Sequence, residues 1–461
     1  MKINFIKLLY KEENDMKKNK GITLVALVVT IVVLLILAGV SINLVLDNNG
    51  IIAKAKDAKT KSAEASENDI KGMNGLVSEM EGALAGNGST GSGSGNGGAG
   101  GSGTDTKVPE AGTAETAPYF PDNTFTKKEG TIDTGLVIQD ASGNEYVWVV
   151  VPRTTAVYKT TGLGKTAFTD ADYTSIEKDL KDYTSTYVRR SGYSDVYYAD
   201  DNNVGWFADA TAYNNLKKSM LKSVYENGGF YVGRYEAGID TTTGTNRTKI
   251  ESQVNGKYPV PTTVPVTKAD AYPYTYVTRT QAQNLASNVN SGTKTSSLMF
   301  GVQWDLVLAF MHNKGNIADS TLTSNSTTIG NYINSTFDLN RGKYAQYDKL
   351  KNTWNNFDSA LGSIVVSNET TGKMKKTEQS SYSNGILLTT GGTEQSKIMN
   401  IYDIAGNVFE WTLEKTSDTY GPCASRGGGF NYTGSNSPAA YRDNYPTDYS
   451  RYFIGFRVSL F

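Results

Sequence analysis

The side chains that most often carry out catalysis are nearly absent from this chain of 461 residues, which has one Cys, Cys423, and one His, His312. A single Cys cannot form a disulfide or a paired-cysteine metal site within the chain. One His cannot supply the two or three imidazoles that most zinc or iron sites use. His312 follows an apolar run and is expected to be a capping or surface residue, and Cys423 a small, partly buried one. Nucleophilic and acid–base catalysis therefore lack their commonest parts, which favours binding over catalysis.

Recognition is the chemistry that the segment between Phe430 and Ile454 can offer. It interleaves five Tyr residues with Asn, Asp, Ser and Arg. Tyr rings give rigid contact area at a low cost in entropy, and small polar groups give adaptable hydrogen bonds. The alternative is that some of these Tyr residues only pack a loop-rich fold. The predicted ligand contacts are Asn431, Tyr432, Asn436, Asp443, Tyr445, Tyr449 and Tyr452.

The charges of the chain nearly cancel, with 45 Lys and Arg against 46 Asp and Glu. No overall field points to nucleic acid, which is not expected as a partner. The 29 Tyr and 47 Gly residues suit a recognition surface. They suit a β-rich secreted domain equally well, so composition leaves both interpretations open.

The N-terminal part is expected to anchor the protein in the cell membrane. From Gly21 to Leu46 there is no charged residue, and this run is long enough to cross a hydrocarbon core of about 30 Å. Lys17, Lys18 and Lys20 place the N-terminus on the cytoplasmic side. We therefore predict a cytoplasmic leader at residues 1–21 and a single transmembrane helix at residues 22–46. A signal anchor or a cleaved secretory signal is the alternative, although the apolar run exceeds the roughly 7–15 residues of a signal peptide.

The junction at residues 20–27, Lys-Gly-Ile-Thr-Leu-Val-Ala-Leu, resembles the type IV prepilin leader. In that family a short basic leader ends in Gly just before the apolar helix, and a start at Met16 would give the leader a typical length. The resemblance implies cleavage after Gly21, with Ile22 as the new N-terminus, and other pilin subunits as partners. Pilins usually carry Glu where this chain has Ala26, so assembly into a pilus stays open.

Two segments separate the membrane from the C-terminal part. Residues 47–85 are predicted to form an amphipathic stalk helix, because they are rich in Ala, Lys and Glu and carry apolar residues spaced by three and four. This stripe fits packing on neighbouring subunits, docking on its own domain or a coiled coil. Residues 86–107 are Gly/Ser-rich and are expected to be a flexible linker, which makes stalk and head mechanically independent.

Residues 108–461 are predicted to form a head of α+β class with much irregular loop. Short strand-like runs alternate with turns rich in Gly, Asn, Asp and Thr, and residues 146–152 are the clearest buried strand. Short helices are expected at residues 281–286 and 306–311, and helical patterns are otherwise few.

Several segments of the head resemble, in order, the formylglycine-generating-enzyme (sulfatase-modifying factor) family, which has a C-type-lectin-like fold. They are GFYVGRYEA at 229–237, PYTYVTRTQAQ at 273–283, GVQWD at 301–305, IYDIAGNVFEW at 401–411, RGGGF at 426–430 and IGFRV at 454–458. The resemblance covers roughly residues 130–461 and is weak between 313 and 397. It implies a C-type-lectin-like head, in which Arg442 is expected to be a structural ion-pair partner.

The resemblance also implies a calcium site. In the family a Ca²⁺ ion is held by the loop that IYDIAGNVFEW forms. Carried over position by position, its ligands are the Asp403 carboxylate, the Gly406 and Val408 carbonyls and the Glu410 carboxylate. Hard oxygen ligands suit Ca²⁺. The alternative is that Asp403 and Glu410 only satisfy backbone N–H groups at the turn.

Copper is not expected. The oxidase of this family holds copper with two cysteines between the Arg-Gly-Gly segment and the terminal Gly-Phe-Arg, and the corresponding interval, residues 427–454, contains no Cys. A branch of the family uses a three-His iron site, which a single His312 cannot form. The family's known chemistry is therefore not expected, and whether the protein is an enzyme at all stays uncertain.

The tyrosine-rich segment corresponds to the face where the oxidase of the related fold binds its substrate. It also resembles the variable region of diversity-generating-retroelement target proteins, which use the same fold and end just before a similar Gly-Phe-Arg. The sequence thus predicts a cell-surface ligand-binding or adhesion protein. Its pilin-like anchor would present a non-catalytic, lectin-like head to an extracellular protein or glycan. The alternatives are a divergent enzyme of the resembled family and a minor pilin that acts only in assembly.

Overall fold

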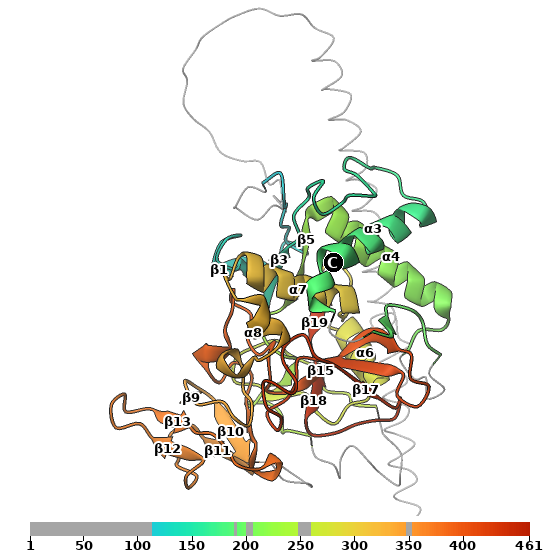
Figure 1. Cartoon of the computed structure of the whole chain (residues 1–461). Coiled ribbons are helices and arrows are strands. Elements are labelled where there is room, and N and C mark those ends of the chain that lie inside the picture. The colour runs from blue at the N-terminus through green and yellow to red at the C-terminus, as the bar shows by residue number, and fades with distance from the viewer. Residues whose placement is uncertain (1–112, 189–190, 200–205, 248–259, 347–352) are drawn as a thin grey trace, which may run out of the picture. The chain divides into compact units, whose positions relative to one another are not determined.

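The structure, a computed structural model, describes residues 113–188, 191–199, 206–247, 260–346 and 353–461 (Figure 1). All of them belong to one compact unit, Ser102–Phe461. The predicted leader, transmembrane helix, stalk helix and linker lie outside the described residues, as do Gly21 and Ile22. Within the described ranges, no helix combines the length and the apolar character needed to cross a membrane.

A six-stranded sheet contains the first strands of the head and the last strand of the chain. Its order is β1 (Thr126–Glu129), β2 (Val137–Gln139), β3 (Glu145–Val150), β5 (Gly229–Gly233), β19 (Val458–Leu460) and β8 (Ser296–Leu298). All neighbouring strands run antiparallel. Strand β3 is buried along its whole length, because it is an unbroken run of apolar and aromatic residues after Glu145. The strand predicted at 146–152 is confirmed for residues 146–150, and it ends two residues earlier than predicted.

The helices are more extensive than the sequence patterns suggested. They are α3 (Asp170–Tyr183), α4 (Ala210–Asn227), α6 (Arg279–Ser287), α7 (Gly301–Asn313) and α8 (Asp319–Thr323). The two predicted helices are confirmed as parts of α6 and α7, whereas α3 and α4 were not predicted. Their start signals are nevertheless present, since the side chains of Thr169 and Asp209 cap the first turns of α3 and α4. Helices α3 and α4 contact each other, and α7 contacts β3 (Figure 1).

A second sheet brings three of the family-like segments together. It contains β17 (Arg442–Tyr445), β16 (Cys423–Arg426), β15 (Phe409–Thr416) and β18 (Ile454–Phe456), with β4 (Tyr193–Ser194) on the free part of β15. Strands β15, β16 and β17 are antiparallel neighbours, and β18 runs parallel to β15. The tyrosine-rich segment therefore starts shortly after β16 and ends at β18, two strands of one sheet. A short pair, β6 (Gly238–Ile239) and β7 (Tyr272–Pro273), lies apart from both larger sheets.

We call the part formed by residues 337–346 and 353–388 the finger, because its strands β9 to β13 project from the rest of the head in Figure 1. It contains β9 (Phe337–Asp338), β10 (Lys343–Gln346), β11 (Thr353–Asn356), β12 (Val365–Ser367), β13 (Met374–Lys376) and β14 (Ile386–Leu388). The strands form two three-stranded sheets, β11-β10-β14 and β12-β13-β9. Most of their apolar side chains, among them Phe337, Val365 and Leu388, pack into a small core separate from the main one, whereas Leu387 of β14 belongs to the main core.

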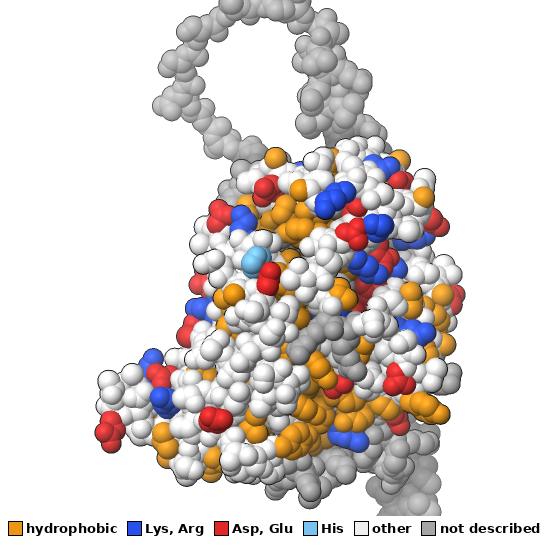
Figure 2. Space-filling view, in the orientation of Figure 1, with side chains coloured by type: hydrophobic (Ala, Val, Ile, Leu, Met, Phe, Trp, Pro, Cys, Tyr) orange, Lys and Arg blue, Asp and Glu red, His pale blue; other side chains and the backbone are white. Residues whose placement is uncertain are grey.

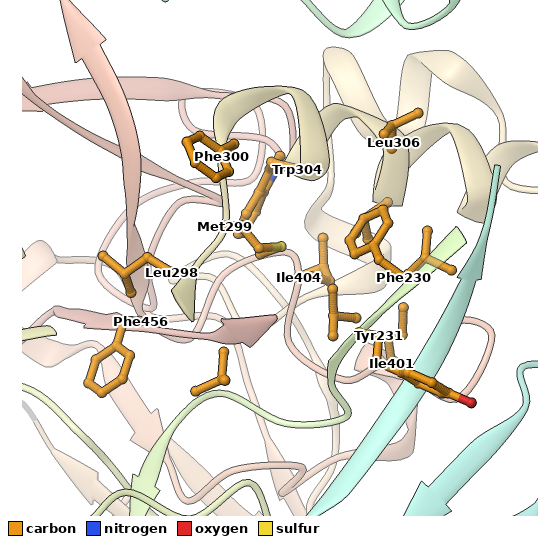
Figure 3. Packing of buried hydrophobic residues seen from close by; sticks show 14 of the residues in the cluster. Phe230, Tyr231, Leu298, Met299, Phe300, Trp304, Leu306, Ile401, Ile404 and Phe456 are labelled. Carbon is orange, nitrogen blue, oxygen red and sulfur yellow. The ribbon is translucent and has the colours of Figure 1, made fainter. Parts of the chain in front are cut away.

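The main core lies between the six-stranded sheet, α7 and the second sheet. Figure 3 shows Trp304 of α7 beside Met299 and Phe300, with Phe230 and Ile404 packed nearby. The Trp304 Nε1–H donates to the carbonyl of Ala439 at 3.0 Å, which links this core to the loop before β17. The predicted α+β class is confirmed.

Candidate ligand-binding face

Six Tyr residues from two separate parts of the chain form one cluster, which we call the tyrosine face. They are Tyr382, Tyr432, Tyr441, Tyr445, Tyr449 and Tyr452. Phe409, Phe430 and Phe453 pack against them from the core. In Figure 2 hydrophobic side chains, a class that includes Tyr, gather over the region where Figure 1 places β17 and β18.

The centre of the tyrosine face is a stack of planar groups. The rings of Tyr445 and Tyr449 are 4.3 Å apart between centroids and only 14° from parallel. On the Tyr449 side, the Arg451 guanidinium lies 4.5 Å from the ring centroid. On the other side, Tyr445 meets Trp411 edge to face at 5.8 Å. Aromatic and cation–π contacts of this kind fix the rings in place before any ligand arrives.

A second group of rings surrounds Tyr432. Tyr432 meets Phe409 edge to face at 5.5 Å and Tyr382 at 5.8 Å. The hydroxyl oxygens of Tyr382 and Tyr452 lie 2.9 Å apart and share a hydrogen bond. Tyr382 is 42% exposed and Tyr452 only 6% exposed. The ring of Tyr382 is therefore accessible to a ligand, and the buried Tyr452 holds its hydroxyl in place.

Strand β17 orients the polar members of the site by its alternation. Asp443 and Tyr445 are two residues apart and so point to the same side of the strand, where the Tyr445 hydroxyl donates to Asp443 Oδ2 at 2.7 Å. Arg442 is buried, and its backbone pairs with that of Arg426 on the neighbouring strand β16.

Beneath the tyrosine face lies a buried cluster of four charges. Arg442 bonds Asp305 Oδ2 at 2.5 Å and Glu414 Oε1 at 3.0 Å, while Arg426 bonds the other oxygens of the same two carboxylates at 2.5 and 3.3 Å. Burial alone would raise the pKa of Glu414, but Arg442 and Arg426 hold this pKa below its ordinary value. The prediction that Arg442 is a structural ion-pair partner is confirmed.

Two tyrosine hydroxyls of the face, those of Tyr432 and Tyr445, remain protonated at neutral pH. Burial, and then Tyr382 and Asp443 among its neighbours, raise the pKa of Tyr432 to about 12. Burial and the neighbouring Asp443 carboxylate raise the pKa of Tyr445 further above its ordinary value. Each hydroxyl can therefore donate a hydrogen bond as well as accept one.

Asn431 carries an unusual side chain for a buried position. It is 2% exposed, and neither its Oδ1 nor its Nδ2 has a hydrogen-bond partner within the protein. Leaving a buried amide unpaired costs about 1–3 kcal/mol, so such a group needs an explanation. In the chain it lies between Phe430 and Tyr432, whose rings contact Tyr452 and Tyr382 of the tyrosine face.

The structure brings most, but not all, of the predicted ligand contacts together. Tyr432, Asp443, Tyr445 and Tyr449 are partly exposed members of one cluster. Asn431 and Tyr452 are buried, so they can support the face more readily than they can form its surface. Asn436 is exposed, and its N–H donates to the Thr433 hydroxyl within the same turn.

Sequence reasoning missed Tyr382, Arg451 and the role of Trp411. Tyr382 reaches the face from the end of the finger, 70 residues before its hydrogen-bond partner Tyr452. No local pattern could have placed it there. Arg451 and Trp411 were visible in the sequence. The contact of Trp411 with Tyr445 depends on how β15 and β17 pair with β16, and the contact of Arg451 with Tyr449 depends on the conformation of the loop after β17.

The four positions predicted to bind calcium lie around a tight turn, where Asp403 and Gly406 have φ angles of 59° and 74°. Asp403 accepts hydrogen bonds from the Ser396 hydroxyl at 2.6 Å and the Gly391 N–H at 2.8 Å. Glu410 receives two bonds from the Arg457 guanidinium, at 2.7 and 3.1 Å. The guanidinium thus neutralises the Glu410 carboxylate. Of the donors to the two carboxylates, the Gly391 N–H is a backbone group, as the alternative expected, whereas Ser396 and Arg457 donate from their side chains.

A further buried carboxylate, that of Glu236, bonds to residues of this turn. Glu236 accepts from Asn407 Nδ2 at 2.6 Å and from the Val408 N–H at 3.1 Å. Burial first, and then the charges of Asp403 and Glu410, raise the pKa of Glu236 well above its ordinary value. Within the described ranges, no group of three or more His, Cys, Asp or Glu side chains is placed to hold a metal ion.

A groove of about 580 Å³ between α4 and α6 is a competing place for a ligand, with Trp206, Phe207 and Gln283 among the residues that line it. Several of its polar groups already have partners within the chain. Gln283 Oε1 accepts from the Leu298 N–H, and the Ser291 hydroxyl donates to the Lys294 carbonyl. The tyrosine face, with its preorganised rings and its exposed Tyr382, is therefore the better candidate.

No family model matches the chain, and no curated protein matches it. Among solved structures, Treponema denticola variable protein 1 is 14% identical, over 50% of this chain and 84% of its own, with a TM-score of 0.25. A crystal structure of CarF is also 14% identical, over 58% of this chain and 95% of its own, with a TM-score of 0.28. Both likenesses are too distant to decide the fold family or the function of this chain.

Proposed function

We propose that the protein is a cell-surface ligand-binding or adhesion protein whose tyrosine face holds an extracellular protein or glycan. The observation that carries this proposal is the preorganised stack of Tyr445 and Tyr449 in the same face as the exposed ring of Tyr382. Rings that are fixed before binding lose little entropy on contact with a ligand.

The chemistry of the two scarce side chains supports binding over catalysis. Cys423 is fully buried within β16, so a substrate could reach its thiol only if the sheet opened. His312 lies at the end of α7 on the surface, where its ring nitrogen is 2.8 Å from the Ile317 carbonyl oxygen (Figure 2). Neither residue belongs to the tyrosine face, and a nucleophile–base pair needs its members within hydrogen-bond reach.

Three finer statements belong to the same proposal. The head is of the C-type-lectin-like type that the formylglycine-generating-enzyme resemblance implies. The segment between Phe430 and Ile454 is its ligand-binding, and by resemblance variable, region. The predicted membrane helix at 22–46 presents this head outside the cell, either alone or within a pilus. The support for these statements is the sequence resemblance together with the α+β class of the head.

Binding is tested with the full-length protein in detergent, applied to arrays of glycans and of extracellular proteins. We expect wild-type protein to bind a defined subset of spots, and the Tyr445→Ala/Tyr449→Ala double variant to lose them. The matched control is Tyr173→Ala, which removes a similar ring from α3, stacked on Phe168 at 5.6 Å and outside the tyrosine face. Equal binding by the double variant, with both proteins folded by circular dichroism, would refute the proposed site.

A further inference from the structure

We propose that the finger is a working part of the binding site: Tyr382 determines specificity at the tyrosine face, and Lys376 positions the loop that supports it. This inference rests on the proposed function of the tyrosine face. It assigns roles to the region of the chain where the sequence resemblance is weakest.

Tyr382 is the member of the face that a ligand can reach most directly. It is 42% exposed, whereas the other Tyr residues of the face are buried or intermediate. Its ring meets Tyr432 edge to face, and its hydroxyl shares a hydrogen bond with that of Tyr452. The ring is therefore held in a defined orientation at the edge of the stack, as a ligand-contacting residue requires.

A short connecting loop, residues 331–335, joins the finger to the tyrosine-bearing loop. The Ile333 N–H donates to the Tyr432 carbonyl at 2.9 Å, and Asn334 Oδ1 accepts from the Gly434 N–H at 3.2 Å. On the finger side, the Gln379 N–H donates to the Ile333 carbonyl at 2.9 Å. The position of Tyr432 thus depends on a loop that the finger itself holds.

Lys376 fastens this connecting loop. Its side chain is fully buried, and its Nζ donates to the carbonyls of Tyr332 at 2.7 Å and Ser335 at 2.8 Å. The Phe337 ring lies 5.2 Å away. Burying an amine is expensive unless it is fully hydrogen-bonded, so these two bonds fix both ends of the loop to β13.

The separate core of the finger allows its residues to change without disturbing the rest of the head. Phe337, Val365, Met374 and Leu388 pack with one another and not with the main core. Changes in the finger can therefore alter the ring that Tyr382 presents without repacking the head. Substitutions either in the finger or in the segment between Phe430 and Ile454 can therefore change which ligands the tyrosine face prefers.

The test of Tyr382 compares full-length wild-type, Tyr382→Ala, Tyr382→Phe and Tyr173→Ala proteins on the same glycan and protein arrays. We expect Tyr382→Ala to lose some bound spots and to weaken others by about tenfold, with Tyr382→Phe intermediate and Tyr173→Ala unchanged. An unchanged pattern in Tyr382→Ala, alongside loss in Tyr445→Ala/Tyr449→Ala, would overturn the role of Tyr382 alone. If wild-type protein bound no spot, the proposed function itself would fail.

The test of Lys376 needs no ligand. Hydrogen exchange is measured by mass spectrometry in Lys376→Met and in Lys375→Met, a matched change at the neighbouring, partly exposed Lys. We expect faster exchange in Lys376→Met within residues 327–336 and 427–437, and unchanged exchange in β3. Exchange that rises everywhere, or nowhere, would show that Lys376 does not position these loops, whatever the arrays report.

Discussion

Tyr445 and Tyr449 stack almost in parallel, and the two rings belong to different structural elements. Tyr445 ends β17, whereas Tyr449 lies in the loop that leads to β18. The stack therefore ties a loop to a strand in the middle of the candidate site. Arg451 closes the outer side of the stack, so the three groups order the loop together.

Removing Tyr449 should weaken both the loop and the site. In Tyr449→Ala, the ring contacts of Tyr445 and Arg451 with residue 449 are lost, and we expect the free energy of unfolding to fall by about 1–2 kcal/mol. Urea denaturation measures this change. Tyr449→Phe keeps the ring and should retain most of the stability, and equal losses in the two variants would contradict the stacking argument.

In the four-charge cluster, replacing one charged side chain should cost more stability than its share of the cost of replacing an oppositely charged pair. Arg442→Met leaves Asp305 and Glu414 with only Arg426, and removing one partner of a buried ion pair costs about 3–5 kcal/mol. Because Arg442→Met/Glu414→Gln removes a charge of each sign, we expect the double variant to lose clearly less than the two single losses added together. Denaturant midpoints of all four proteins test this, and strict additivity would argue against a coupled cluster.

The parts of the fold that the sequence predicted are those with strong local patterns. Strand β3 and helix α7 are long apolar runs, and such runs are buried wherever they lie. Helix α3 was missed because most of its residues are charged or polar. Its burial depends on a few residues such as Ile176 and Leu180, four positions apart. A capping box at Thr169 and Asp172 was the available signal.

The candidate site was predictable only in the segment that supplies most of it. The mixture of Tyr with Asn and Asp between Phe430 and Ile454 pointed to recognition. Which of these residues are buried could not be predicted, because irregular loops have no periodicity that separates Tyr452 from Tyr449. Tyr382 joins the face through a contact across 70 residues, which no sequence pattern encodes.

Calcium should have little effect on the head if Glu410 stays paired with Arg457. We expect the midpoint of thermal unfolding to be the same in EDTA and in millimolar Ca²⁺. By contrast, Arg457→Met should lower the free energy of unfolding by about 3–5 kcal/mol, because it leaves the buried Glu410 carboxylate without its cation. A rise in the midpoint on adding Ca²⁺ that Asp403→Asn abolishes would favour the calcium site that the family resemblance implies.

Lys376 should give the protein a stability that increases with pH. Burial lowers the pKa of Lys376 from 10.5 to about 7 in the folded protein, so between these values the unfolded chain binds more protons than the folded one. The free energy of unfolding then rises with pH across this window, by at most about 1.4 kcal/mol per pH unit from this group. The buried tyrosines act in the opposite sense only above about pH 10, where the unfolded chain begins to lose their protons.

Urea denaturation of wild-type and Lys376→Met proteins at pH 6, 7.5 and 9 isolates the contribution of Lys376 to the free energy of unfolding. We expect the stability difference between the two proteins to shift in favour of wild type as the pH rises from 7.5 to 9. Lys375→Met should instead follow wild type at all three values, and parallel pH curves for wild type and Lys376→Met would show that the buried amine titrates as it does in water.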